Sequence, residues 1–164
     1  MKMQEVWLRE GPVTLDPLRH LLVCTLVQAE EDILAETEGL TDEAIWLRPH
    51  GVSPIGFHIR HIAESIDRLL TYAEGRMLDS VQLKCLQTEL TEKLSLSSLL
   101  CLLKERLAAA RQRVEVIPAH SLAAERSIGR AGLRVPLGSL LAHIAEHTQR
   151  HLGQITTTAR LLRD

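Results

Sequence analysis

The sequence predicts an all-α protein, a four-helix bundle with long crossover connections. Apolar residues make up 45% of the 164-residue chain and aromatic residues only 2%, so the core must be packed from aliphatic side chains, which suits helices. Four stretches of about twenty residues repeat their apolar residues at every third or fourth position, the period of an α-helix. At least one connection between them is long, as in bundles with crossovers. The length suits a single domain covering residues 1–164.

The first helix is expected over about 16–38. Asp16 followed by Pro17 is typical of an N-cap and a first helical residue, and Gly39 is a natural stop. Its apolar positions are Leu18, Leu21, Leu22, Leu26, Ala29, Ile33 and Leu34. The connector that follows contains Trp46, which we expect to pack into the core.

The remaining elements follow from the same signals. The second helix is expected over about 53–74, with an apolar stripe and a glycine beyond its end. Residues 76–93 are less regular and predict a loop with a short helical piece. A third helix is expected from 95 or 97 to 117, before a proline. The glycine-rich connection after it predicts an extended stretch around 126–135, and the last helix should occupy 136–162.

Composition argues against several classes of protein. The 19 basic and 21 acidic side chains give a formal net charge of −2, so no strong field attracts nucleic acid or an anionic membrane. No apolar run reaches the roughly 20 residues of a membrane span, and the first residues lack a signal-peptide core, so we expect a cytoplasmic protein. Cys24, Cys85 and Cys101 have no CxxC spacing and are expected to be buried or half-buried, without disulfides or a thiolate zinc site.

Histidines provide the main chemical signal. The chain has eight, and three of them recur every fourth residue in "LLAHIAEHTQRHLGQI": His143, His147 and His151. Residues four apart lie one turn apart on the same helix face, so His147 and His151 have the HxxxH geometry of helical zinc sites. His61 on the second helix is the natural third ligand. Three histidines leave one or more coordination positions open, as catalytic sites require.

Neighbouring polar residues are assigned weaker roles. His58 lies about 60° around the helix from the predicted ligand and is expected to support the site or face the substrate. His58 and Glu64 are therefore the candidate acid–base helpers, although Glu64 could equally be a surface residue. His143 is expected beside the site and not in it. Gln154 is expected to orient a ligand or make a helix contact, and Gly153 to permit close helix packing.

Other readings are open at this point. A GxSxG motif and a glycine-rich phosphate loop are absent, and the second and fourth helices lack the Glu-x-x-His pairs of di-iron bundles. The histidines could belong to a catalytic centre, to a closed site that stores, senses or structurally uses a metal, or to a bundle that binds none. Buried imidazoles without a shared partner are costly, which favours a metal.

The segments "PIGFHIRHIAESIDRLLTYAEGR" and "LLAHIAEHTQRHLGQI" resemble the DinB/YfiT-like superfamily of metal-dependent enzymes, over nearly the whole chain. The resemblance implies a four-helix bundle with a long crossover and a metal triad of His61, His147 and His151. It also implies nickel or zinc as the metal, a homodimer, and a small-molecule substrate. The activity it implies first is a thiol-dependent S-transferase that uses a low-molecular-weight thiol. A metal-dependent hydrolase and a non-catalytic metal-binding or stress-response module are the alternatives.

Overall fold

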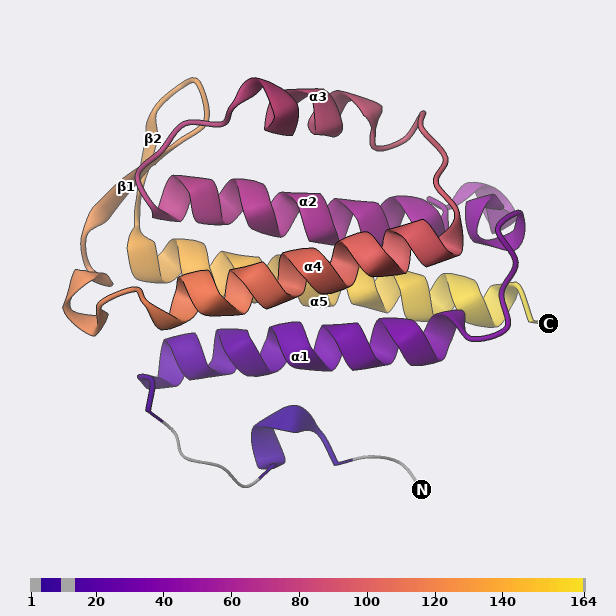
Figure 1. Ribbon diagram of the computed structural model, residues 1–164, viewed down its shortest axis with the longest axis horizontal. Coiled ribbons are helices and arrows are strands. Elements are labelled where there is room, and N and C mark those ends of the chain that lie inside the picture. Colours follow the sequence, from indigo (N-terminus) through magenta and orange to yellow (C-terminus); the bar gives the residue numbers. More distant parts are fainter. Residues whose placement is uncertain (1–3, 10–13, 164) are drawn as a thin grey trace.

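A computed structural model of the chain describes residues 4–9 and 14–163, and it confirms the predicted four-helix bundle (Figure 1). The bundle helices are α1 (Pro17–Thr37), α2 (Ile55–Ala73), α4 (Leu96–Glu115) and α5 (Leu137–Leu161). The predicted short helical piece is α3 (Ser80–Thr88), and the predicted extended stretch is a hairpin in which β1 (Glu125–Ile128) pairs antiparallel with β2 (Leu133–Pro136). Short 3-10 segments occur at Val6–Leu8, Ala44–Trp46, Pro49–Gly51 and Ala119–Ser121.

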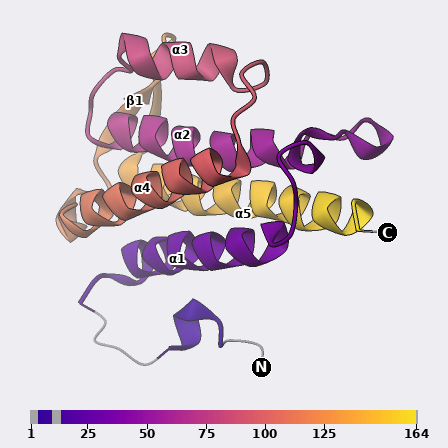
Figure 2. The ribbon, with the colours of Figure 1, turned by 45° about the vertical axis from the view of Figure 1, so that its right-hand side comes forward.

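The bundle has an uncommon chain path. α1 and α2 occupy opposite corners, and each of them packs against both α4 and α5 (Figures 1 and 2). After α2 the chain returns along the outer side of the bundle through α3 before it enters α4, so α2 and α4 run in the same direction. This return segment is the long crossover that the sequence predicted. It also places α3 over the face of α2 that the other bundle helices leave uncovered.

Local signals explain where the helices begin. The Asp16 carboxylate accepts hydrogen bonds from the backbone N–H groups of Leu18 and Arg19 at 3.1 Å, which caps α1. Asp79 and Gln82 form a reciprocal capping box at the start of α3. These bonds satisfy N–H groups that a helix leaves without internal partners.

Trp46 packs against the core, as predicted, and lies on the first turn of α2. Its indole N–H donates to the Leu94 carbonyl oxygen at 2.9 Å, and its ring lies against Gly56. A Cβ atom at Gly56 would lie 2.7 Å from the indole, closer than atoms can pack. The glycine therefore permits the tryptophan to rest on the first turn of the helix.

Three side chains are more exposed than their sequence pattern suggests. Leu21 and Leu34 of α1 are 53% and 49% exposed, because α1 has bundle neighbours on one side only and its apolar stripe is wider than the covered face. Cys101 is exposed, whereas Cys24 is buried and Cys85 half-buried as expected.

α2 is enclosed on every side. Of its 19 residues 15 are buried, so charged and polar side chains lie inside the protein together with the isoleucines. The buried polar residues of α2 are His58, Arg60, Glu64, Ser65, Arg68 and Thr71. Burial of charged side chains requires partners, and several of these partners come from α3 and the loop after it.

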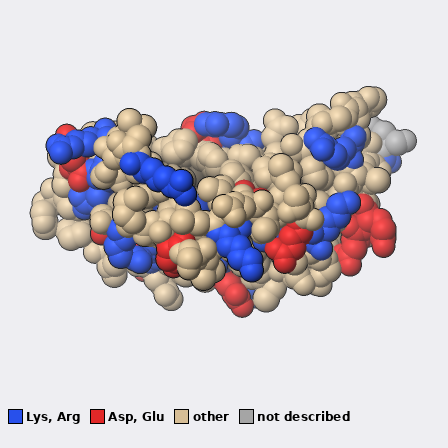
Figure 3. All heavy atoms as spheres, turned by 90° about the horizontal axis from the view of Figure 1, so that it is seen from above, with Lys and Arg blue, Asp and Glu red and all other residues tan. Residues whose placement is uncertain are grey.

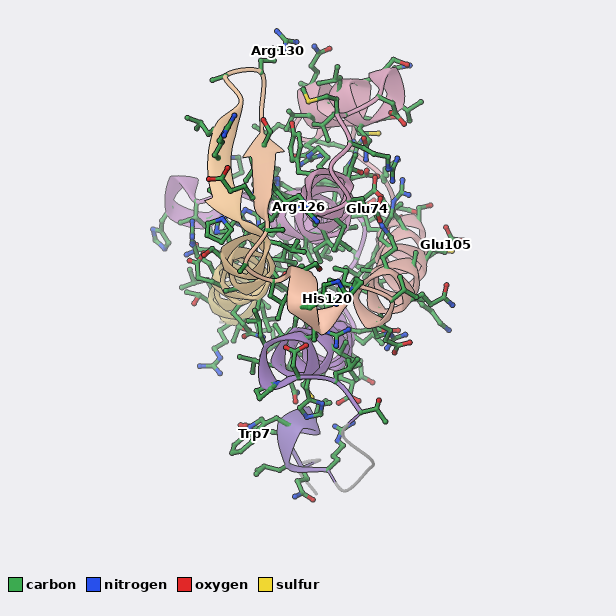
Figure 4. The ribbon with its side chains drawn as sticks, turned by 90° about the vertical axis from the view of Figure 1, so that its left-hand side faces the viewer. Trp7, Glu74, Glu105, His120, Arg126 and Arg130 are labelled. Carbon is green, nitrogen blue, oxygen red and sulfur yellow. The ribbon has the colours of Figure 1, made fainter. Side chains whose placement is uncertain are left out.

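The hairpin closes one end of the bundle. Viewed from that end, Arg126 of β1 points toward the last turn of α2 (Figure 4), where its Nε donates to the Ala73 carbonyl oxygen at 2.6 Å. Arg113 of α4 meets Glu74 at the same end, with 2.6 Å between Nε and Oε1. The two arginines thus tie β1 and α4 to the end of α2.

Within residues 4–9 and 14–163, no helix combines the length and the apolar character that a bilayer crossing needs. On the face seen in Figure 3, basic and acidic side chains are interspersed among uncharged ones.

Candidate metal centre

The three predicted ligands, His61, His147 and His151, meet between α2 and α5. One potential ligand atom from each side chain lies within 4.8 Å of the other two. Nε2 of His61 is 3.3 Å from Nε2 of His147, and the His151 ring centroid is 4.5 Å from that of each partner. Three nitrogen atoms from two helices therefore converge on one point.

Helix geometry explains the convergence. His147 and His151 stand one turn apart on α5, and α5 packs directly against α2, which supplies His61. Phe57 stacks on the His61 ring with 5.3 Å between centroids, and its edge faces His58 and His151. All three histidines are half-buried, so the cluster lies at the edge of the core.

His61 has a partner on its other ring nitrogen that the sequence did not predict. Its Nδ1 lies 2.7 Å from Oε2 of Glu89, the residue directly after α3, and Glu89 is only 4% exposed. Nη1 of Arg68, which belongs to α2, lies 2.7 Å from the other carboxylate oxygen. The sequence did not indicate Glu89, because it lies in the irregular segment 76–93. No periodicity there predicts which side chains face inward.

His58 lies beside His151 at the cluster. Its Nδ1 lies 2.9 Å from Nδ1 of His151, and the side chain is buried. The structure thus places His58 beside His151, and its role as an acid–base helper stays a prediction. Since Nδ1 of His151 is engaged by His58, Nε2 is the nitrogen of His151 that is left for a metal.

The environment favours the uncharged form of His58, His147 and His151. Burial, followed by the neighbouring rings of the cluster, lowers the pKa of His58, His147 and His151 from 6.5 to about 4. For Glu89 burial is the largest influence and raises the pKa, but the His61 hydrogen bond and the Arg68 charge outweigh it, so its pKa is lowered. Near neutral pH His147 and His151 therefore offer uncharged imidazoles, the form that binds metal ions.

The hydrogen bonds of the cluster leave nitrogen lone pairs that a cation could bind. When His61 donates from Nδ1 to Glu89, its Nε2 carries a lone pair that faces Nε2 of His147 at 3.3 Å. A metal ion would use both lone pairs and leave the His147 proton on Nδ1, a buried atom without a hydrogen-bond partner among the described residues. Imidazole nitrogens suit zinc, nickel, copper and iron, so the residues present fit a divalent transition metal.

The other predicted residues lie outside the cluster. His143 is 47% exposed at its side chain and pairs with Glu146, with 3.2 Å between Nδ1 and Oε2. Gln154 and Gly153 face solvent, and a Cβ at Gly153 would touch nothing within 4 Å, so the predicted close packing at this glycine is wrong. Glu64 is buried on the α4 side of α2.

Glu64 has a charged neighbour there. Its Oε2 lies 3.7 Å from Nη2 of Arg106, a residue of α4. The carboxylate thus has an ionic partner away from the histidines, and its role as an acid–base helper stays a prediction.

A surface hollow of about 710 Å³ lies elsewhere, between the first 3-10 segment, α1 and α5. Trp7, which Figure 4 shows at the far side of α1 from α3, is one of its walls. None of the clustered histidines lines this hollow, so it is separate from the candidate metal centre.

Comparisons with known proteins agree with this description. A family model described as the DinB superfamily matches residues 25–155. Among solved structures, the chain is similar to YfiT from Bacillus subtilis, described as a probable metal-dependent hydrolase with an unusual four-helix bundle topology. The TM-score is 0.68 at 14% identity, and the match covers 93% of this chain and 92% of YfiT. A search of curated proteins found no match.

Proposed function

This protein belongs to the DinB superfamily, and from that premise we propose that it is a metal-dependent enzyme whose divalent ion is held by His61, His147 and His151. The observation that carries the proposal is the convergence of three imidazoles on one half-buried point. Three protein ligands leave coordination positions for a small molecule, as in catalytic zinc sites. A closed structural site would instead have four protein ligands.

The chain's own residues would prepare the ligands and shield them. A divalent ion bound here would lower the pKa of a coordinated thiol or water and so supply a nucleophile near neutral pH. If Nδ1 of His151 donates its hydrogen bond to Nδ1 of His58, Nε2 of His151 carries the lone pair that would bind the ion. Phe57 covers the rings of His61 and His58 and limits the access of water from its side.

We propose thiol transfer as the specific reaction: a low-molecular-weight thiol adds its sulfur to a small electrophilic substrate. Support for this choice is the family resemblance of the two histidine-bearing segments. Hydrolysis is the second candidate, favoured by the description of YfiT, whose fold this chain shares. Nickel and zinc are the two metals that we propose to test first.

Elemental analysis tests the metal. Purified protein should contain about one equivalent of nickel or zinc, and His147→Ala should lose it. His143→Ala is the matched control, because His143 lies one turn from His147 on the same helix but is exposed and outside the triad. Metal-free protein that remains tightly folded after reconstitution would refute the proposal.

An activity comparison separates the two reactions. Metal-loaded protein is incubated with a model electrophile and a panel of thiols, and in parallel with ester and amide substrates in the absence of thiol. Product that appears only with thiol and only in metal-loaded protein supports transfer. Product that forms without thiol supports hydrolysis. Loaded protein that is inactive in both assays would favour a non-catalytic metal-binding module.

A further inference from the structure

We infer that Glu89, held by Arg68, is a positioning residue that fixes the tautomer and the orientation of the His61 ring. The inference rests on the proposed function in one respect, since it assigns the oriented nitrogen to the metal. The observation behind it is a buried chain of contacts from Arg68 through Glu89 to His61, with 2.7 Å at each step.

The contact with Glu89 places a proton on one particular nitrogen of His61. A carboxylate accepts hydrogen bonds, so the 2.7 Å contact to Glu89 requires that the His61 proton is on Nδ1. In the neutral imidazole Nε2 then carries the lone pair, and it faces Nε2 of His147 at 3.3 Å. A neutral imidazole in water prefers to carry its proton on Nε2, so the carboxylate reverses the intrinsic preference. Histidine ligands commonly donate their second N–H to such a group.

Glu89 is held in place by contacts to the neighbouring backbone and to its carboxylate. Arg60 of α2 donates from Nη1 to the carbonyl oxygens of Thr88 and Glu92, at 3.1 Å each. These two bonds fix the backbone on both sides of Glu89. Arg68 then pairs with the carboxylate itself, and both side chains are less than 10% exposed. Glu89 is thus fixed at its backbone and at one oxygen, and its other oxygen is directed at His61.

The ion pair between Arg68 and Glu89 is buried. Two buried charges pay a desolvation cost that their attraction often fails to recover, so a buried pair is weak evidence of a stabilising role. Attachment of α3 to α2 is already provided by Arg60. The pair at Glu89 adds what an apolar contact does not, an acceptor of fixed direction beside a ligand. The structure therefore separates two tasks: Arg60 holds the segment, and Arg68 holds the carboxylate.

The test begins without metal. Long-range ¹H–¹⁵N spectra of the metal-free protein should show His61 with its proton on Nδ1. Glu89→Gln preserves the shape of the side chain but can either donate or accept, so His61 should lose its single tautomer. Arg68→Lys keeps a counter-ion for the carboxylate and should retain the Nδ1–H form. Glu92→Gln is the matched control, because Glu92 pairs with Arg60 and does not touch a histidine.

The second readout is zinc affinity, measured by competition with a chromogenic chelator. Glu89→Gln should bind zinc about 10–100-fold more weakly, the range typical when a group that orients a ligand is lost. Glu92→Gln should match the parent. An unchanged tautomer, or unchanged affinity with a lowered melting temperature, would overturn the inference and assign Glu89 a purely structural role.

The two proposals fail in different ways. If the parent protein binds neither zinc nor nickel, the proposed function fails, but the tautomer of His61 in the metal-free protein still decides whether Glu89 orients that ring. If the parent binds zinc and Glu89→Gln changes neither readout, the metal centre stands and the positioning role fails.

Discussion

Metal binding should raise the thermal stability of the protein, because the folded chain alone presents the three ligands together. His61 and His147 are 86 residues apart in the sequence, so an unfolded chain rarely holds them near one another. A ligand that binds only the folded state at 100 times its dissociation constant adds about 2.7 kcal/mol to the free energy of unfolding. For a chain of this length, 1 kcal/mol corresponds to about 2–4 °C. The expected increase in melting temperature is therefore about 5–11 °C.

Differential scanning fluorimetry of chelator-treated protein, titrated with zinc or nickel, measures this increase. His147→Ala should remove most of the shift, because two imidazoles bind far more weakly than three. His143→Ala should retain it, since its side chain pairs with Glu146 outside the triad. Equal shifts in parent and His147→Ala would mean that the metal binds elsewhere, and the reasoning would be refuted.

Three further predictions concern stability. Gly56→Ala should lower the melting temperature by a few degrees: the added Cβ overlaps the indole of Trp46, and overpacking costs about 1–3 kcal/mol, against less than about 1 kcal/mol gained in helix propensity. Gly153→Ala should instead be neutral or raise it, because its Cβ meets nothing and only the propensity gain remains; a loss there would contradict the exposed position. In the metal-free protein, urea denaturation should show stability falling as the pH drops from 6.5 toward 4, because the unfolded chain takes up protons that the folded chain, with its lowered histidine pKa values, does not. His58→Phe should make that fall shallower, and a flat profile in the parent would contradict the assignment.

The fold could be predicted because its signals are local. Apolar period, an N-cap at Asp16, and glycines and prolines at helix ends define the four long helices, and all of them lie close together in the sequence. Burial depends on distant neighbours, which is why Leu21 and Leu34 are exposed although they belong to the apolar stripe of the first helix. Their spacing is correct, but the other bundle helices, α2, α4 and α5, do not cover that side of α1.

The histidine cluster could be predicted for a similar reason. His147 and His151 are brought together by helix geometry alone, and His61 follows once two helices pack against each other. Glu89 could not be found in this way. It follows a short helix of nine residues in a segment without periodicity, and long-range contacts with Arg60, Arg68 and His61 hold it inside the protein.

The enclosure of α2 has a consequence for how the chain tolerates change. A helix that faces solvent on one side accepts many substitutions there, but α2 has almost no such side, since 15 of its 19 residues are buried. Its apolar residues are constrained by packing and its charged residues by partners on other elements. In a scan of all single substitutions, α2 should therefore stand out as a continuous intolerant block. On α5 intolerant and permissive positions should alternate with the helical turn.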